Sequence, residues 1–166
     1  MKLLKPAVLA LACALLLAGL NHQTRGVIAE NQKFFEQKLL REMVSRETSS
    51  PDIVETPGGF EVSSDEAIVA HIKRMTTAQG YNGDISMLVA FTPEKQVLSV
   101  RVTRHRETAG IGDKIDITVS PWITQFDGTD SNTRWALAPA GDIDGITGAT
   151  ITSRAVTQAI SEVLIQ

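Results

Sequence analysis

The sequence has very little cysteine: Cys13 is the only one in 166 residues. A single cysteine excludes a disulfide framework within the chain, a multi-cysteine zinc site and a C-x-x-C-H haem attachment. The histidines His22, His71 and His105 lie far apart and lack ligand-like spacing, so no metal site is expected. The chain also lacks a basic excess, because its net charge is -3 and its pI is about 5.6. A nucleic-acid partner is therefore not expected.

Long apolar runs are absent except at the N-terminus, where an uncharged run from Pro6 to Leu20 follows Lys2 and Lys5. The run is short for a membrane span, which takes about 20 apolar residues, and a cleaved signal peptide is the alternative. No A-x-A cleavage site follows the run, however, since the next letters are N-H-Q-T. We therefore expect residues 1–25 to be a retained N-terminal transmembrane helix with its lysines on the cytoplasmic side.

The segment after the anchor divides into a helical pattern and a breaker-rich stretch. Apolar residues recur at helical spacing over Val27–Val44, which predicts an amphipathic helix. Glu47–Gly59 is rich in Ser, Thr, Pro and Gly and is typical of a linker or an exposed loop. A chain of this length holds one domain with an appended segment. We assign residues 26–59 to the amphipathic helix and linker, and residues 60–166 to a single folded domain.

Several strands are expected in this domain. Apolar alternation over Ile85–Phe91 and Gln96–Thr103, joined by T-P-E-K, predicts a β-hairpin. Ile115–Val119 is predicted to be a further short strand and Pro121–Phe126 a short helix. Phe60–Thr77 is ambiguous from its residues alone, because it fits either a capped helix or a hairpin.

The clearest predicted helix covers Ala155–Leu164, whose apolar residues form one face, with Thr152 or Ser153 as its cap. The loop that feeds it reads D-G-I-T-G-A-T, from Asp144 to Thr150. A helix N-terminus offers unpaired N–H groups to a phosphate, glycines permit close approach, and threonines supply hydroxyl groups. The alternative is an Asp-Gly turn and a threonine cap with nothing bound. The spacing matches neither a P-loop nor a dinucleotide-binding fingerprint.

Two further stretches have the character of binding loops. R-H-R-E-T-A-G-I-G-D-K, Arg104–Lys114, follows a predicted strand and places a carboxylate and a hydroxyl beside two glycines that bracket Ile111. Such a loop suits a planar ligand with polar edges, and a charged surface turn is the alternative. G-Y-N-G, Gly80–Gly83, places an aromatic ring between glycines just before a strand and is by itself an ordinary turn.

Together these stretches resemble one family, the FMN-binding domains of the Rnf/Rsx electron-transport G subunit and of the related C subunit of sodium-translocating NADH:quinone reductase. D-G-I-T-G-A-T resembles the flavinylation motif D-G-x-[ST]-G-A-T, and H-R-E-T-A-G-I-G-D-K resembles H-x-E-T-P-G-L-G-D-K. Four further stretches are more similar to the G subunit than to the C subunit of the quinone reductase. They are R-V-T, W-I-T-Q-F, T-G-A-T-I-T-S-R-A-V and N-H-Q-T-R-G-V-I-A-E-N. The chain departs from the family pattern at Ala109, where proline is usual, and at Ile111, where leucine is usual.

The resemblance implies an α+β fold: one FMN-binding domain with a twisted, largely antiparallel sheet and flanking helices, preceded by the transmembrane helix. It favours a hairpin over Phe60–Thr77. It implies an electron-transfer subunit at the cell inner membrane, single-pass, with its FMN domain on the periplasmic side. The partners implied are the other membrane subunits of an Rnf-type complex and a separate flavin transferase. No catalytic residue is expected, so the chain is not expected to be an enzyme by itself.

The resemblance also assigns site residues. FMN is joined through a phosphoester to Thr150, the last threonine of the motif. The other residues implied for cofactor binding are Thr147, Gly148, Ala149, Glu107, Thr108, Gly110, Ile111 and Gly112, with Tyr81 and Gly83 as further candidates. Asp144 and Gly145 are implied for recognition by the transferase. The functional alternatives are a stand-alone periplasmic flavoprotein, acting as a reductase or an electron shuttle, and a flavin-less domain that binds partners.

Overall fold

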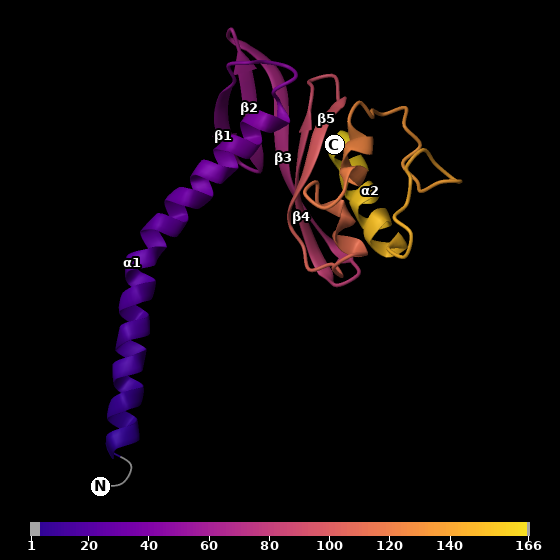
Figure 1. Ribbon diagram of the computed structural model, residues 1–166. Helices are drawn as coiled ribbons and strands as arrows, with labels where there is room; N and C mark the ends of the chain where they lie inside the picture. Colours follow the sequence, from indigo (N-terminus) through magenta and orange to yellow (C-terminus); the bar gives the residue numbers. More distant parts are fainter. Residues whose placement is uncertain (1–3, 166) are drawn as a thin grey trace. The chain divides into compact units, whose positions relative to one another are not determined.

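The chain divides into two compact units, with the boundary between Leu40 and Arg41. The computed structural model describes residues 4–165 (Figure 1), without the side chains of residues 4–10, 12, 20, 22, 29 and 165. Helix α1, Leu4–Met43, runs through the first unit and ends a few residues into the second. The helix predicted over Val27–Val44 lies within α1 and is confirmed as a helix as far as Met43.

The predicted anchor, residues 1–25, begins outside the described residues. From Leu4 onward it is part of α1. No helix among the described residues has both the length and the apolar content needed to cross a membrane.

The second unit is built on a five-stranded sheet in which neighbours in sequence are neighbours in space. All four strand pairs are antiparallel. This confirms the α+β class and the largely antiparallel sheet. The strands are β1 (Asp52–Thr56), β2 (Gly59–Ser64), β3 (Ala67–Gly80), β4 (Gly83–Phe91) and β5 (Val97–Arg104).

Both predicted hairpins are present. β4 and β5 form the first, and β2 and β3 form the second within Phe60–Thr77. The second hairpin turns at Asp65 and Glu66, which have φ angles of 51° and 66°. Two consecutive residues of positive φ give a turn whose twist matches that of the paired strands. The residues of this segment are also compatible with a capped helix, and the pairing of β2 with β3 excludes that alternative.

The predicted linker over Glu47–Gly59 is wrong in one respect, because it contains β1. The strand pairs residue by residue with β2, from Asp52 opposite Ser63 to Thr56 opposite Gly59. β1 is short, mostly exposed and at the edge of the sheet, so few apolar residues mark it in the sequence. The Pro-Gly pair at 57–58 forms the tight β1–β2 turn, where Gly58 has a φ of 105°.

The predicted strand over Ile115–Val119 is also wrong. Ile115 ends a 3-10 helix, η1 (Gly112–Ile115), and the chain then turns at Asp116. The Asp116 carboxylate accepts hydrogen bonds from the backbone N–H and the hydroxyl of Thr118, both at 2.8 Å. Local side-chain bonds of this kind compete with strand pairing.

The predicted short helix at Pro121–Phe126 is confirmed as a second 3-10 helix, η2 (Pro121–Phe126). Ser120 caps it by accepting a hydrogen bond from the Trp122 N–H at 3.1 Å, and proline stands in its first turn.

The main core lies between one face of the sheet and helix α2, Thr150–Ile165, with η1 and η2 beside it (Figure 1). Alternate residues of β4 face this core, because successive side chains of a strand point to opposite faces. They meet the apolar face predicted for α2. The fully buried residues of this core include Ile85, Met87, Val89, Ile115, Ile123, Phe126, Val156 and Ile160.

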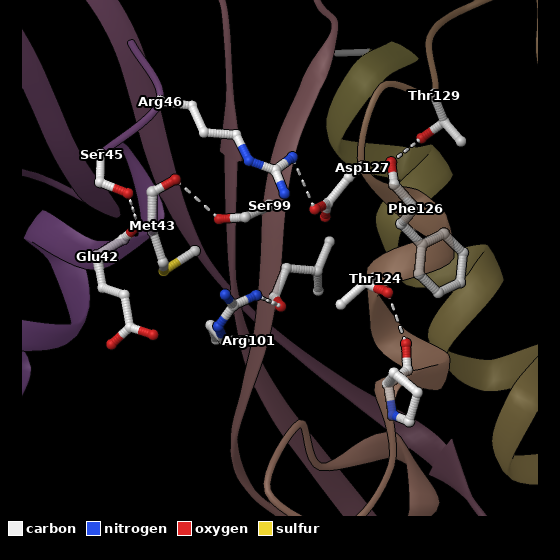
Figure 2. Close-up of polar contacts among 12 residues, drawn as sticks. Glu42, Met43, Ser45, Arg46, Ser99, Arg101, Thr124, Phe126, Asp127 and Thr129 are labelled. Atoms are coloured by element: carbon white, nitrogen blue, oxygen red, sulfur yellow. Dashed lines mark hydrogen bonds and ion pairs between the residues drawn. The ribbon is translucent and has the colours of Figure 1, made fainter. Parts of the chain in front are cut away.

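The other face of the sheet is covered at its β5 end by the residues that close α1. Met43 and Val44 are buried, and the Met43 carbonyl accepts a hydrogen bond from the buried Ser99 hydroxyl at 3.0 Å (Figure 2). Three residues later Arg46 forms an ion pair with Asp127 at 3.3 Å, next to the end of η2 (Figure 2). This part of the sheet is thus covered on both faces, and β4 is buried from Met87 to its end.

Candidate functional site

Three segments that are far apart in the sequence enclose one cavity of about 430 Å³. They are the turn between β3 and β4, the loop that follows β5, and the start of α2 with the residues just before it. These segments carry the three stretches singled out in the sequence. The lining residues are Tyr81, Glu107, Thr108, Ile111, Gly112, Gly148, Ala149, Thr150, Ile151 and Thr152.

Glu107 joins all three segments. Its side chain is buried, with the residue 8 % exposed. One carboxylate oxygen, Oε1, accepts a hydrogen bond from the Asn82 N–H at 3.0 Å, in the β3–β4 turn. The other, Oε2, accepts one from the Thr152 hydroxyl at 2.5 Å, in the first turn of α2. A further hydrogen bond joins the β3–β4 turn to the loop after β5, because the Asn82 side-chain amide donates to the Thr108 hydroxyl at 3.1 Å.

Glycines make room for this carboxylate. A Cβ at Gly80 would lie 2.9 Å from Glu107 Oε1, and a Cβ at Gly112 would lie 2.9 Å from Glu107 Cβ. Both distances are too short for real side chains, so only glycine fits at these positions. The Glu107 loop is itself tightly closed, because the Thr108 carbonyl accepts hydrogen bonds from the N–H groups of three residues, 111, 112 and 113.

The motif loop enters α2 through a left-handed residue, Gly148, with a φ of 84°. Thr150 is the first residue of α2, lines the cavity and is exposed. On the buried side, the Ser153 hydroxyl accepts a hydrogen bond from the Ile146 N–H and donates one to the Ala149 carbonyl, both at 2.9 Å. The loop is thereby held against the helix that it starts.

The predicted cap of this helix is wrong. Because α2 begins at Thr150, Thr152 and Ser153 lie inside its first turn. Their hydroxyl groups are buried and bonded elsewhere: Thr152 donates to Glu107, and Ser153 bonds within the motif loop. These partners come from tertiary packing, which a capping pattern in the sequence does not register.

The outer end of the motif is held by η2. The Asp144 N–H donates to Gln125 Oε1 at 2.8 Å, and the Asp144 carbonyl accepts from Trp122 Nε1 at 2.7 Å. The side chains of Asp144 and Thr147, like the backbone of Gly145, stay exposed. The motif loop is therefore fixed through its backbone, while the groups proposed to meet a partner face the solvent.

A salt bridge closes the loop that precedes the motif. Arg134 donates to Asp142 Oδ1 from Nε at 3.0 Å and from Nη2 at 2.6 Å, and its backbone N–H donates to Oδ2 at 2.8 Å. The hydrogen bonds from Arg134 lower the pKa of the Asp142 carboxyl below its usual value. The carboxylate therefore stays charged and keeps the loop closed over a wide pH range.

Large apolar side chains surround the mouth of the cavity. Tyr81 is 66 % exposed, Ile111 44 % and Ile151 51 %. Each comes from a different one of the three segments. Exposed apolar groups that converge on a cavity indicate a binding site for a partly apolar ligand.

Most of the residues predicted to bind the cofactor line this cavity. They are Tyr81, Glu107, Thr108, Ile111, Gly112, Gly148, Ala149 and Thr150. The other three are not among the lining residues: Gly83 and Gly110 have positive φ angles of 115° and 77° at turns, and Thr147 is exposed on the motif loop.

Three residues of the site are not predicted from the sequence: Asn82, Ile151 and Thr152. Asn82 lies inside G-Y-N-G, and asparagine in a turn often forms local hydrogen bonds, which is the signal that could have identified it. Ile151 lines the cavity and lies outside the buried face of α2. An exposed apolar residue at such a position indicates a contact with a ligand or a partner. Thr152 is predicted from the sequence only as a helix cap, and its hydroxyl instead donates to Glu107. No group of three or more His, Cys, Asp or Glu residues in the described part of the chain is placed to hold a metal ion.

Comparison with known proteins tests the resemblance. The model of the FMN-binding domain matches residues 80–165, just over half of the chain. The chain belongs to the FMN-binding domain family. It is 36 % identical, over 163 residues, to the G subunit of the ion-translocating oxidoreductase complex of Escherichia coli K12, with 87 % of this chain and 79 % of that protein covered.

Two further relatives are also named as the G subunit of the ion-translocating oxidoreductase complex. The G subunit of Shewanella amazonensis is 32 % identical over 177 residues, covering 94 % of this chain and 82 % of its own length. The G subunit of Pectobacterium atrosepticum is 34 % identical over 173 residues, covering 93 % and 83 %. Among solved structures, the C subunit of the Na⁺-translocating NADH-quinone reductase from Parabacteroides distasonis is 20 % identical with a TM-score of 0.47, over 63 % of this chain and 57 % of that one. The resemblance found in the sequence is confirmed by the family model and by the relatives named as G subunits.

Proposed function

We propose that this chain is an electron-transfer flavoprotein subunit of a membrane Rnf-type complex, and that it carries FMN through a phosphoester to Thr150. One observation carries the proposal: an exposed threonine opens α2 at the edge of the cavity in which three predicted binding stretches converge. Membership of the FMN-binding domain family supports the identity of the cofactor.

The position of Thr150 suits an esterified phosphate, which keeps a negative charge. The first N–H groups of any helix lack intrahelical partners and carry partial positive charge, so they stabilise an anion there. Gly148 adds a backbone segment without a side chain next to the ester site. Thr147, exposed one residue earlier, would orient the phosphate or contact the transferase.

The cavity suits the flavin ring system. Its volume of about 430 Å³ falls within the range of small-molecule sites. Tyr81, Ile111 and Ile151 supply apolar surface for the ring, while Thr108 and Glu107 supply polar groups for its edges. The flavin would supply one-electron redox chemistry, and the chain would position it and shape its electrostatic environment.

The proposed partners are the other redox subunits of the complex and a flavin transferase. The relatives are named as the G subunit of an ion-translocating oxidoreductase complex, which supports a role inside an assembly. The exposure of Asp144, Gly145 and Thr147 supports access of a transferase to the motif.

We also propose a single N-terminal membrane anchor, with the FMN domain on the periplasmic side of the inner membrane. The uncharged run Pro6–Leu20 and the lysines before it support this orientation. The described leucines of that run, Leu11, Leu15, Leu16 and Leu17, are all exposed on α1, as lipid-facing side chains would be.

The test is covalent flavinylation of the full chain co-expressed with a flavin transferase. After denaturing electrophoresis, wild type should show flavin fluorescence at the position of the chain. Thr150→Ala should be dark, while Thr118→Ala, at another exposed threonine, should fluoresce like wild type. A dark wild type would refute the covalent attachment of FMN, because denaturing electrophoresis removes any cofactor that is not covalently bound. A fluorescent Thr150→Ala would refute the attachment site alone.

A further inference from the structure

Among the residues that line the cavity, Glu107 is the only acidic one, and none is lysine, arginine or histidine. A carboxylate in a partly apolar cavity has a stronger electrostatic effect on its neighbours than one in water, because the surroundings screen it less. A ring bound in this cavity would lie near the Glu107 carboxylate, and no basic side chain among the lining residues offsets that negative charge.

Two hydrogen-bond donors point at the carboxylate of Glu107. A backbone N–H only donates, so the Asn82 bond requires an acceptor at Oε1. The Thr152 hydroxyl donates to Oε2. Donors aimed at both oxygens stabilise the negative charge of a carboxylate.

The carboxylate is also held in one place. Gly80 and Gly112 leave no space beyond that which Glu107 fills, and the two donors come from separate segments. Glu107 therefore acts as a fixed charge and, at the same time, as the link between the walls of the cavity.

We propose that Glu107 is a positioning residue whose fixed negative charge lowers the reduction potential of the flavin carried on Thr150. The inference rests on the proposed function. An electron passed from a redox partner to the flavin adds negative charge to the ring, and the nearby carboxylate makes this addition less favourable. The reduced flavin thereby becomes a stronger electron donor toward the next redox subunit.

The experiment is a redox titration of the full chain, loaded with flavin by a co-expressed transferase and followed by flavin absorbance. Glu107→Gln keeps the shape and an acceptor for Asn82, and it removes the charge. We expect it to favour the reduced flavin about tenfold at a given potential, a shift of about 59 mV to more positive values for one electron. Glu162→Gln is the matched control, an exposed glutamate twelve positions along α2 from Thr150 and roughly 18 Å away. It should titrate like wild type.

Glu107→Asp separates charge from packing. The shorter side chain keeps the charge but does not reach both donors, so we expect a lower unfolding midpoint and a potential within a few millivolts of wild type. If Glu107→Gln fails to fold, this variant still tests the inference, because a shift of its potential to positive values while the charge is kept would overturn it. Equal potentials for wild type and Glu107→Gln overturn the inference alone. A wild type without covalent flavin overturns the proposed function, and the inference with it.

Discussion

Gln125 and Asp144 form a two-point contact between η2 and the first residue of the motif loop. Gln125 Oε1 accepts from the Asp144 N–H at 2.8 Å, and Gln125 Nε2 donates to the Asp144 carbonyl at 3.3 Å. The side-chain amide of Gln125 thus pairs with the backbone as a neighbouring strand would. Trp122 Nε1 donates to the same carbonyl, and its ring packs edge-on against Phe126 at 5.4 Å. The start of the motif is therefore tied to the core through the residues of η2.

Removing this contact should destabilise the domain. Gln125→Met keeps the side-chain length and deletes both hydrogen bonds, for an expected loss of about 1 to 3 kcal/mol. Trp122→Phe keeps an aromatic ring against Phe126 and deletes one donor, for about 1 kcal/mol. Urea unfolding of the full chain measures both. Gln158→Met, at an exposed position of α2, is the control, and a loss equal to that of Gln125→Met would show that the contact contributes nothing.

Gly80→Ala should disturb the wall of the cavity. Its Cβ would overlap the Gly83 carbonyl oxygen and lie 2.9 Å from Glu107 Oε1, so the turn and the carboxylate must move apart. We expect a cost of about 1 to 3 kcal/mol from overpacking. Gly128→Ala is the comparison, because Gly128 has a φ of 82° and open space around it, so only backbone strain of about 1 kcal/mol applies. Thermal unfolding that ranks Gly128→Ala as the more damaging change would contradict the crowding argument.

The Arg46–Asp127 ion pair should stabilise the fold only where Asp127 is charged (Figure 2). Burial raises the pKa of the Asp127 carboxyl above its usual 3.8, against the opposing charges of Arg46 and Arg101. The folded chain thus binds this proton more tightly than the unfolded chain does. The stability that the group contributes is complete below about pH 4 and is lost as the pH rises through the raised pKa.

Arg46 offsets part of that loss by stabilising the charged form. Its side chain is 77 % exposed, so the screened pair is worth at most about 1 kcal/mol. Arg46→Met should therefore destabilise the protein by up to this amount at neutral pH and by nothing at acid pH. Urea unfolding across this pH range tests the expectation, with Arg41→Met as the control. A cost that persists below the pKa of Asp127 would assign the role of Arg46 to packing.

Ser99→Ala should loosen the contact between β5 and the end of α1 (Figure 2). The buried Met43 carbonyl loses its side-chain donor, and a single buried hydrogen bond of this kind is worth about 1 kcal/mol. The unfolding midpoint of Ser99→Ala is compared with that of Ser161→Ala, whose hydroxyl bonds only within α2 at an exposed position. Equal midpoints for the two variants would rule out a contribution from the Met43 contact.

Local patterns predicted most of the elements. Alternation over Ile85–Phe91 and Gln96–Thr103 specifies a hairpin because a strand shows a different side chain to each face with every residue. The apolar positions of α2 recur at helical spacing because one face must be buried. Both signals lie within a few residues of sequence, and both predictions are confirmed.

Two of the three errors share a cause. β1 is an exposed edge strand, and its pairing with β2 rather than its own composition makes it a strand. Asp116 turns the chain where Ile115–Val119 alternates like a strand. Thr152 has the residue type of a helix cap, but its hydroxyl bonds to a carboxylate 45 positions away in sequence. For β1 and Thr152 a contact outside the local window determines the structure, whereas the Asp116–Thr118 bond is local and competes with strand pairing.

The residues alone specify the available chemistry: a motif rich in threonine and glycine that leads into a helix, a glycine-bracketed loop and an aromatic turn. They also carry enough of the family pattern for the resemblance to be drawn. Only the tertiary structure decided that these stretches enclose one cavity, that Asn82 and Thr152 both donate to Glu107, and that Gln125 holds Asp144. Antiparallel pairing of β3, β4 and β5, with α2 packed on them, brings the three segments together. That convergence depends on burying one shared core, a property of the whole chain that no single stretch displays.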